Sequence, residues 1–580
     1  MERLKRVIAE HLRSLFASMN LEEEHWTQHL QQSRDMSQGD VSLPCFPFAK
    51  QLKKSPIEIA ESLANTFPNL PAIRECNAVN GYLNFRASNE WMYQQLDDCT
   101  QPPLHPKHIL IEHTSANPNG PFHVGRARNA ILGDTLVRLH RLAGHEVTAE
   151  YYVDDMGKQV AVLAWALENL SKERVDSLLK DRTEDNDMWE GKSDHQSVRW
   201  YQAAQLLRQS SENKEEIEHA IAKMVHASEH GDEGVLAQFA DAYQPVLDGM
   251  LETLLRLGIS FDRFTKESTF VINGDVANLI HRLKQSELHS EAENGAFFLD
   301  LEPRGLKGKT EFFYCRGDGS SLYATRDIAY HLWKWTQSNF LVNVLGEDHK
   351  LQAKQVGLTL EELNSKSPEI VFYSFIKLPE GKMSTRKGNV VFMDDLLEEA
   401  HAHAASVVKE LRPDYTEDEV ATIAEAVGTS AVRFNIIKVS PEKGFTFKWE
   451  DALAFEAGSA PFVMYAHTRA CSIEEKVKST SNLHQLEISN WNDVPEGCEM
   501  LLRHLLLFQD QLKSAVIENR PHIFATYMLQ LATAYHAFYR DCHILEDKSV
   551  QLSYLKISEI AKLALNKGLT GLGIVPLESM

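Results

Sequence analysis

The sequence predicts a multidomain α/β protein: a Rossmann-like domain with a parallel sheet, flanked by an α+β N-terminal domain and an all-helical C-terminal domain. Three observations support this class. The 580 residues are too many for one hydrophobic core. Within residues 108–153 a strand, a turn-rich loop, a helix and a second strand follow one another, which is the βαβ unit that builds parallel sheets. From about residue 400 onward the apolar residues recur with a helical period.

Residues 1–105 are expected to form the N-terminal domain. The chain begins with an amphipathic helical pattern, and Pro56 stands where a second helix would start. Residues 81–88 alternate apolar and polar side chains, as a half-buried strand does. The proline-rich stretch 101–107 is typical of a linker.

The central domain is expected over residues 106–400. Its first strand (108–113) and second strand (146–153) enclose a helical stretch that stops at Gly144. Ligands of open parallel sheets bind at the carboxyl ends of the strands, so the loop after the first strand should face a site.

A helical insertion is expected at about residues 160–290, where the sequence is charged and helical in period. Strand-like runs resume at 295–301, 340–346 and 369–375. Residues 401–580 form the expected helical C-terminal domain.

Composition excludes several classes of protein. No run of about 18 uncharged apolar residues occurs, so we expect no transmembrane helix, and charges at Glu2 and Arg6 interrupt the stretch that a signal peptide would need. The seven scattered cysteines form no CxxC pair. This favours free, unreactive cysteines in a reducing cytoplasm over a zinc site or a set of disulfide bonds. The net charge of −22 disfavours indiscriminate nucleic-acid binding, although local patches decide specific binding.

The loop before the first helix of the central domain has the features of a phosphate site. His123 lies at the mouth of the βαβ unit, where a helix N-terminus favours anions. Pro121 stiffens the approach, and Gly125 lets a ligand come close to the main chain. Alone, the short HxG string is weakly specific and favours a histidine that caps a surface helix.

A second cationic element, GKMSTRKGN, spans residues 381–389. Lys382, Arg386 and Lys387 lie between two glycines, a composition that suits a departing pyrophosphate. The segment does not satisfy the P-loop pattern. Taken alone, it fits a solvated basic turn as well.

A third group suits a flat cation. Tyr323 and Asp327 are four residues apart at an expected helix start and so share one face. Glu112 ends the first strand at the ligand-binding edge, and Asn117 follows in the loop. Carboxylates beside an aromatic ring bind guanidinium groups, although an exposed helix cap would explain the Tyr323–Asp327 pair too.

Together, these elements resemble the class I aminoacyl-tRNA synthetases. HVGR (123–126) stands where that family has HIGH, and KMSTR (382–386) stands where it has KMSKS. The stretches 112–125, 151–159 and 318–330 narrow the resemblance to arginyl-tRNA synthetases of archaeal type. GDVSLPCFPFAKQLKKSPIEIA (39–60) is similar to that family's N-terminal tRNA-contacting domain, and the C-terminal region is similar to its anticodon-binding domain.

The resemblance implies an arginine–tRNA ligase. Such an enzyme activates L-arginine with ATP to arginyl-adenylate and pyrophosphate, then transfers arginine to the terminal ribose of tRNA(Arg). ATP enters as a substrate with Mg²⁺, and no zinc or organic cofactor is expected. The partners would be tRNA(Arg), L-arginine and ATP, with no membrane, for a cytoplasmic monomer.

Residue roles follow from the same resemblance. His123 and Lys382 are the expected catalytic residues. Arginine would be bound by Glu112, Ser115, Asn117, Tyr323 and Asp327. ATP would be bound by Pro121, His123, Gly125, Arg126, Gly346, Asp348, His349, Lys382, Met383, Ser384 and Arg386. Contacts with tRNA are expected from Tyr465, His467 and Arg469.

Two alternatives stay open at this point. A class I synthetase for another amino acid, such as cysteine or lysine, would share the HxG and KMS elements. A catalytically silent paralogue that binds tRNA is suggested by Arg126, which replaces the second histidine of HIGH.

Overall fold

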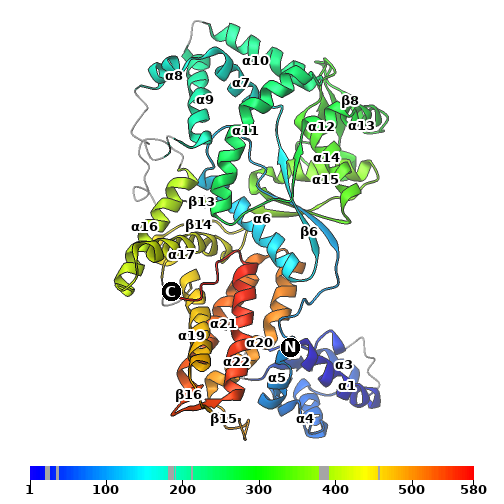
Figure 1. Ribbon diagram of the computed structural model, residues 1–580. Helices are drawn as coiled ribbons and strands as arrows, with labels where there is room; N and C mark the ends of the chain where they lie inside the picture. The colour runs from blue at the N-terminus through cyan, green and yellow to red at the C-terminus, as the bar shows by residue number, and fades with distance from the viewer. Residues whose placement is uncertain are drawn as a thin grey trace.

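A computed structural model of the chain describes residues 1–19, 26–33, 38–180, 189, 191–210, 213–377, 391–454 and 458–580. The molecule is elongated (Figure 1), with the insertion helices at one end, a parallel sheet in the middle, and the N-terminal domain beside the C-terminal helices at the other end.

The N-terminal domain is a four-stranded antiparallel sheet packed against helices, in the order β1-β2-β4-β3. Helix α4 (Pro56–Thr66) begins at the expected proline, where the side chains of Ser55 and Glu58 form a capping box. The remaining elements are α1 (Glu2–Ser18), β1 (Gln31–Gln32), β2 (Val41–Pro44), α3 (Ala49–Leu52), β3 (Ile73–Val79), β4 (Tyr82–Ala87) and α5 (Asn89–Gln94).

The central sheet has five parallel strands in the order β12-β11-β5-β6-β7. In chain order this is 5-4-1-2-3, the doubly wound arrangement expected of a Rossmann-like domain. The strands are β5 (His108–Glu112), β6 (Glu146–Val153), β7 (Arg263–Lys266), β11 (Phe340–Gly346) and β12 (Glu369–Tyr373), and the helices beside them are α6 (Val124–Leu142), α14 (Tyr323–Gln337) and α15 (Lys350–Glu362).

The residues described between β6 and β7 form the insertion and are mainly helical. Its helices are α7 (Lys158–Asn169), α8 (Lys172–Leu179), α9 (Ser193–Ser210), α10 (Lys214–Glu229) and α11 (Glu233–Arg256). Strand β7 falls inside the range that the sequence assigned to the helical insertion. It has only four residues, too few for its period to be recognised beside long helices.

The expected strand at 295–301 is present as β9 (Phe297–Asp300), but it belongs to a separate antiparallel sheet. Its neighbours there are β8 (His289–Glu291) and β10 (Glu311–Cys315), and the short helices α12 (Ser268–Ile272) and α13 (Asp275–Lys284) precede it.

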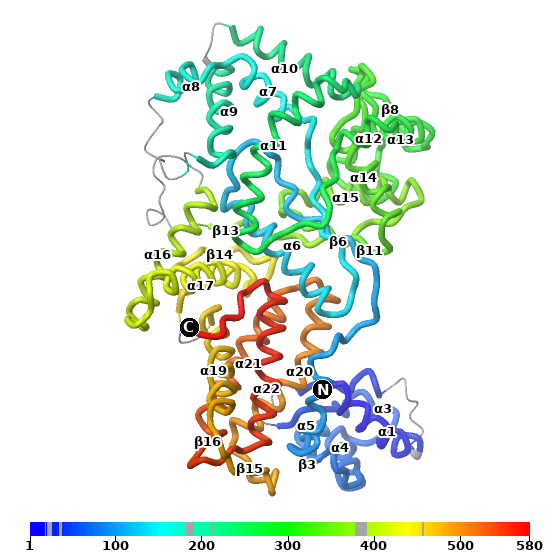
Figure 2. The backbone as a smooth tube through the Cα atoms, in the orientation of Figure 1, coloured from blue at the N-terminus to red at the C-terminus, as the bar shows by residue number. Residues whose placement is uncertain are grey.

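The C-terminal region is a bundle of long helices that continues past the sheet (Figure 2). Its helices are α16 (Met393–Leu411), α17 (Glu417–Ile437), α18 (Trp449–Ala452), α19 (Ala460–Ser479), α20 (Glu496–Ile517), α21 (Pro521–Asp541) and α22 (Leu552–Gly571). Short strands interrupt the helical pattern, namely β13 (Ile376–Lys377) paired with β14 (Phe445–Thr446), and a small sheet of β15 (His484–Leu486), β16 (Leu545–Glu546) and β17 (Ser549–Gln551).

One helix among the described residues, α17, is long and apolar enough to cross a membrane by length and composition. Because 83% of its apolar window is buried inside the protein, its composition is that of a core helix.

Helix α6 joins the central sheet to the C-terminal bundle. It packs on β5, β6 and β11 on one side and on α17, α20, α21 and α22 on the other. Arg433 of α17 is buried at this contact. Its guanidinium lies 2.5 Å from the Asp134 carboxylate of α6 and donates to the carbonyl oxygens of Leu257 and Leu572. One side chain therefore connects the central sheet, the end of the insertion and the last helix.

Replacing Arg433 with Met should lower the free energy of unfolding by about 3–5 kcal/mol, because breaking a buried ion pair leaves an uncompensated charge. Asp134 keeps a second partner in Arg138 at 2.7 Å, so the lower end of the range is expected. Urea unfolding followed by intrinsic fluorescence measures the change. K409M, which removes a half-exposed partner of Glu417, should change the midpoint little. Equal effects of the two substitutions would contradict the role given to Arg433.

Candidate active site

The carboxyl ends of β5 and β11 lie side by side at the centre of the parallel sheet. The strand order reverses between these two strands, and ligands of doubly wound sheets bind in the crevice at such a switch point. The loop 113–123 follows β5, and the turn 346–349 follows β11. Most of the residues expected to bind substrates lie on these two segments and on α14.

The loop after β5 has a strained backbone held by one side chain. Thr114 and Ser115 have φ angles of 67° and 37°, in the left-handed region that residues other than glycine rarely adopt. The Asn129 amide oxygen accepts from the Thr114 N–H at 2.6 Å, and its amide nitrogen donates to the Val344 carbonyl at 2.9 Å. Asn129 thus holds the ends of β5 and β11 together, and such strain often accompanies a binding site.

His113 fixes the start of the same loop. Its ring is buried against Gly133 of α6, where an added Cβ would lie 2.1 Å from the His113 Cβ. Burial lowers the pKa of His113 to about 4, so the imidazole is neutral at neutral pH. Gly133 therefore allows α6 to approach the strand end closely.

His123 is the N-cap residue of α6. Its ring lies over Gly125, where an added Cβ would be 3.0 Å from Nδ1. Burial, together with the nearby Arg126 guanidinium, lowers the pKa of His123 to about 4. The residue therefore offers one N–H and no charge at neutral pH, at a helix terminus that favours anions.

Residues on both sides of His123 define the rest of the helix entrance. Pro121 is buried and Gly125 half-buried. The Arg126 guanidinium donates to the Asn117 carbonyl at 3.4 Å. The Asn117 side chain donates to the Gln159 side-chain oxygen at 3.1 Å, so α7 also helps to hold this loop.

A pocket opens at the switch point between β11, α14 and α15. Among its lining residues are Glu112, Asp327, His349 and Gln352. It thus unites the two carboxylates expected to bind arginine with His349, expected on the ATP side. Asp348 and His349 are exposed, and Gly346 ends β11, where a Cβ would lie 2.4 Å from an Asp348 carboxylate oxygen.

A buried hydrogen-bond chain connects the two carboxylates. The fully buried Lys334 ammonium lies 2.6 Å from Glu112 and donates to the side chains of Asn343 and His331, each at 3.1 Å. Asn343 also donates to His331 Nε2 at 2.7 Å. The ring proton is then on Nδ1, which lies 2.8 Å from the Asp327 carbonyl oxygen and 3.0 Å from the Asp327 carboxylate.

The hydrogen-bond chain leaves the two carboxylates with different partners and so with different net charges around them. Burial alone would raise the pKa of Asp327, but the His331 and Lys334 side chains outweigh it and the pKa is lowered. Asp327 is therefore a carboxylate at neutral pH. Glu112 is paired with Lys334 and accepts from the Ser115 hydroxyl at 3.2 Å. The negative charge left for a cationic ligand is that of Asp327.

A second acidic group, which the sequence did not reveal, lies beside Tyr323 at the ends of β6 and β7. It consists of Asp154, Glu267 and Tyr152, and each has a buried side-chain oxygen without a hydrogen-bond partner among the described residues. Burial raises the pKa of Glu267 to about 8 although Arg326 lies 2.7 Å away.

A sequence signal for Glu267 exists. It directly follows a strand of the parallel sheet, as Glu112 ends one, but recognising it requires that β7 be recognised first. Tyr323 is half-exposed beside this group, and its ring centroid lies 4.7 Å from the Arg326 guanidinium carbon. Buried acceptors next to a phenol have the chemistry that suits a ligand rich in N–H donors.

The expected tRNA contacts divide into two groups. Tyr465 is exposed on α19, and the Arg469 guanidinium lies between two rings, 4.4 Å from the Tyr465 centroid and 4.7 Å from that of Tyr539. His467 is buried, and its Nδ1 hydrogen-bonds to the Leu577 carbonyl. The structure therefore places His467 in the packing of the chain end, with no surface for RNA.

Lys382, Met383, Ser384 and Arg386 lie outside the described residues. The described residues that follow them lie beside His123, because the Val124 N–H donates to the Val391 carbonyl at 3.0 Å and the Met393 N–H donates to the Phe122 carbonyl at 2.7 Å. Residues 391–393 are therefore connected to the start of α6 through main-chain hydrogen bonds.

Replacing Gly133 with Ala should destabilise the protein by about 1–3 kcal/mol, since the new methyl group would overlap His113 and no rotamer relieves it. The midpoint of thermal unfolding measures the change. G234A, at an exposed glycine in α11, should be neutral or stabilising because alanine favours the helix. A G133A protein as stable as G234A would refute the close packing described here.

Comparisons with known proteins agree with this geometry. The family model described as "tRNA synthetases class I (R), catalytic domain" matches residues 95–449. The models described as "Arginyl tRNA synthetase N terminal domain" and "DALR anticodon binding domain" match residues 2–87 and 463–580.

Curated relatives cover almost the whole chain. The arginine–tRNA ligase of Methanocella arvoryzae is 41% identical over 93% of both chains, and that of Methanococcus aeolicus is 38% identical over 94% of this chain and 95% of the relative. The Thermus thermophilus arginyl-tRNA synthetase structure superposes with a TM-score of 0.78 at 26% identity and covers 100% of both chains. The fold class expected from the sequence is thus confirmed, and the chain belongs to the arginyl-tRNA synthetase family.

Proposed function

We propose that this member of the family joins L-arginine to the terminal ribose of tRNA(Arg) in two steps at the switch-point pocket. The observation that carries the proposal is the pocket itself, in which the Asp327 carboxylate lies on the same lining as Glu112 and His349. ATP and arginine must meet for adenylate formation, and this crevice supplies a cation site next to a helix N-terminus that favours phosphate.

The guanidinium of arginine is assigned to Asp327, Tyr323 and Glu267. Asp327 supplies a carboxylate, and the Tyr323 side chain supplies an aromatic face with a phenolic oxygen. Glu267 adds a buried oxygen with no partner among the described residues. Planar, bidentate hydrogen bonding to carboxylates distinguishes arginine from lysine, which favours arginine over the alternative amino acids.

The α-amino and carboxylate end of arginine is assigned to Glu112, Ser115 and Asn117. Because Lys334 and Ser115 already bind the Glu112 carboxylate, its main proposed role is to orient this loop. The Ser115 hydroxyl also accepts from the Tyr152 N–H at 3.1 Å, so the loop and β6 are fixed together.

ATP is assigned to Pro121, His123, Gly125 and Arg126 at the start of α6, and to Gly346, Asp348 and His349 at the end of β11. Lys382, Met383, Ser384 and Arg386 complete this set as a proposal from the sequence. Mg²⁺ is proposed to enter with ATP as part of the substrate.

Catalysis in this scheme is positioning and charge stabilisation. An oxygen of the arginine carboxylate attacks the α-phosphorus of ATP, and the bond to pyrophosphate breaks. The His123 N–H and the Lys382 ammonium stabilise charge on the phosphates. A ribose hydroxyl of tRNA then attacks the arginyl carbonyl carbon, its proton is released, and AMP leaves.

The tRNA is assigned to the C-terminal bundle through Tyr465 and Arg469, whose exposed ring and stacked guanidinium suit single-stranded bases. We also propose that the enzyme acts as a monomer in the cytoplasm, and that its domains divide near residues 105 and 400. Size-exclusion chromatography with light scattering tests the monomer.

Arginylation of tRNA(Arg) transcripts by the purified protein, with lysine as the competing amino acid, tests the function. Formation of arginyl-tRNA is the expected result. Charging with lysine would refute the specificity, and tight tRNA binding without any charging would favour a silent paralogue.

Asp327→Ala should raise the KM for arginine about 100-fold or more, because a buried ligand cation loses its charge partner. The KM for ATP should change less than about twofold, since Asp327 contacts no phosphate in this scheme. D275N, an exposed carboxylate at the start of α13, is the matched control and should leave both constants unchanged. A parallel rise of both KM values would contradict a guanidinium-specific role.

Arginine binding should strengthen as the pH rises from about 6 to about 8. In the protein without ligand, burial raises the Glu267 pKa to about 8, so below this pH the group is protonated and must lose its proton to meet a guanidinium. Affinity should therefore increase by up to about tenfold per pH unit and level off above pH 8. Because the Glu267 pKa is higher in the folded protein than its ordinary value of 4.5, the free energy of unfolding of the ligand-free protein should fall progressively as the pH rises from 4.5 to 8.

Calorimetric titration of arginine at several pH values, in buffers of different ionisation enthalpy, measures this proton release. E267Q should bind more weakly and lose the dependence in that window. A flat wild-type profile between pH 6 and 8 would show that Glu267 does not meet the guanidinium.

A further inference from the structure

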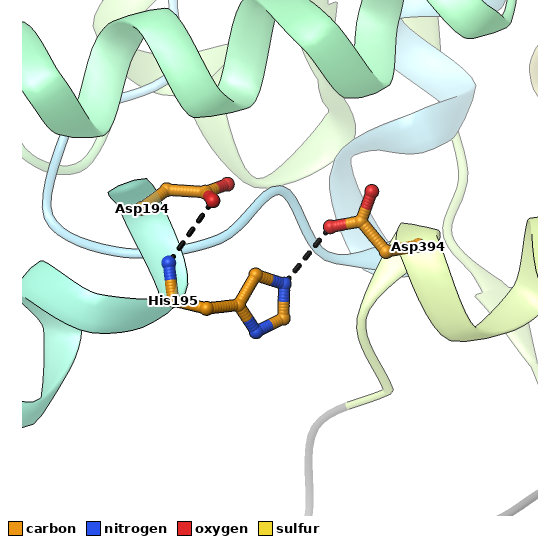
Figure 3. Close-up of side chains that lie close together, drawn as sticks. All are labelled: Asp194, His195 and Asp394. Carbon is orange, nitrogen blue, oxygen red and sulfur yellow. Dashed lines mark hydrogen bonds and ion pairs between the residues drawn. The ribbon is translucent and has the colours of Figure 1, made fainter. Parts of the chain in front are cut away.

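A buried polar cluster lies outside the pocket, where the insertion meets the first turn of α16 (Figure 3). Asp194 and Asp394 are buried there on different elements. His195 connects them, since its Nε2 lies 2.9 Å from an Asp394 oxygen and its N–H donates to Asp194 at 3.0 Å. Two carboxylates removed from water need a cation, because an uncompensated buried charge is costly.

Lys192 supplies this cation from the same protein. Its ammonium lies 2.8 Å from Asp394, 3.0 Å from Asp194 and 2.6 Å from the Thr253 hydroxyl. Asp194, His195 and Asp394 are close enough together to hold a metal ion, but the Lys192 ammonium already binds the carboxylate oxygens that a metal would use. The cluster is therefore an internal ion network.

The network joins three elements. Thr253 of α11 donates to the second Asp394 oxygen at 2.8 Å. The Asp194 carboxylate packs against Gly249 of α11, where a Cβ would lie 2.5 Å from it. The three side chains that contact the Asp394 carboxylate, those of Lys192, His195 and Thr253, thus come from the insertion, while Asp394 itself belongs to the first turn of α16.

The residues just before Asp394 pair with the His123 loop. Phe392 forms a bridge with His123, and the Met393 N–H donates to the Phe122 carbonyl at 2.7 Å. The His195 ring packs edge-on against the Phe392 ring at 5.1 Å. The same short segment therefore contacts the proposed ATP site on one side and the ion network on the other.

We infer that Lys192 and Asp394 are positioning residues for adenylate formation, because they hold residues 391–393 against the His123 loop and so fix the position of His123 at the proposed ATP site. The inference rests on the proposed function. By this inference the insertion contributes to adenylate formation, although none of its residues in the ion network lines the pocket. A misplacement of about 1 Å in a catalytic group can cost about 100-fold in rate.

K192M tests the inference. We expect the kcat of arginylation to fall roughly 10- to 100-fold, while the KM for arginine stays within about twofold because the cation site is untouched. Hydrogen exchange at the amides of Val124 and Met393 should quicken, since their hydrogen bonds depend on the held segment. R199M removes a half-exposed ion pair with Asp176 from the same helix α9 and should leave rate and exchange unchanged.

D394N provides a second variant with nearly the same shape, in case K192M does not fold. D394N should also lower kcat. The double variant K192M/D394N should be no slower than K192M, because both substitutions break the same Lys192–Asp394 ion pair. K192M and D394N with wild-type kcat and wild-type exchange at Val124 and Met393 would overturn the inference. A wild-type enzyme that charges no arginine would instead overturn the proposed function.

Discussion

The close packing of helix α6 is the constraint on which the rest of the site depends. The helix presents His123 at its N-terminus, and Asn129, further along the same helix, holds the ends of β5 and β11. Gly133 allows the approach of His113, and Asp134 receives Arg433 from the C-terminal bundle. Because all these contacts are made by one rigid element, the phosphate site, the strand ends and the bundle cannot shift independently.

Charge in the pocket is controlled by partners that never touch the ligand in the proposed scheme. Lys334 neutralises Glu112, whereas His331 leaves Asp327 ionised and oriented. Glu267 is held near Arg326 but keeps one oxygen unpaired among the described residues. In the proposed scheme a guanidinium meets one carboxylate that is charged at neutral pH and one that becomes charged on binding, which favours a ligand with several N–H donors.

Local patterns in the sequence predicted much of the fold and part of the site. β6 and β11 have the expected bounds, and α14 begins at Tyr323, so that Asp327 shares its face. Contacts between distant residues could not be predicted. Lys334 resembles any helix lysine until Glu112, 222 positions away, is placed beside it. His467 and Tyr465 are two residues apart on one helix, yet only the packed bundle shows that one is buried.

The acidic total of the chain is compatible with a polyanionic partner because the relevant cations are arranged locally. Arg469 makes no ion pair with a carboxylate among the described residues. Its guanidinium instead lies between the rings of Tyr465 and Tyr539 and contacts the His536 ring nitrogen at 3.1 Å. A guanidinium stacked in this way keeps its charge available to phosphate, while the tyrosine rings beside it remain available to bases. By contrast, Lys192, Lys334 and Arg433 are paired internally with buried carboxylates, so a count of charges over the whole chain says little about where RNA binds.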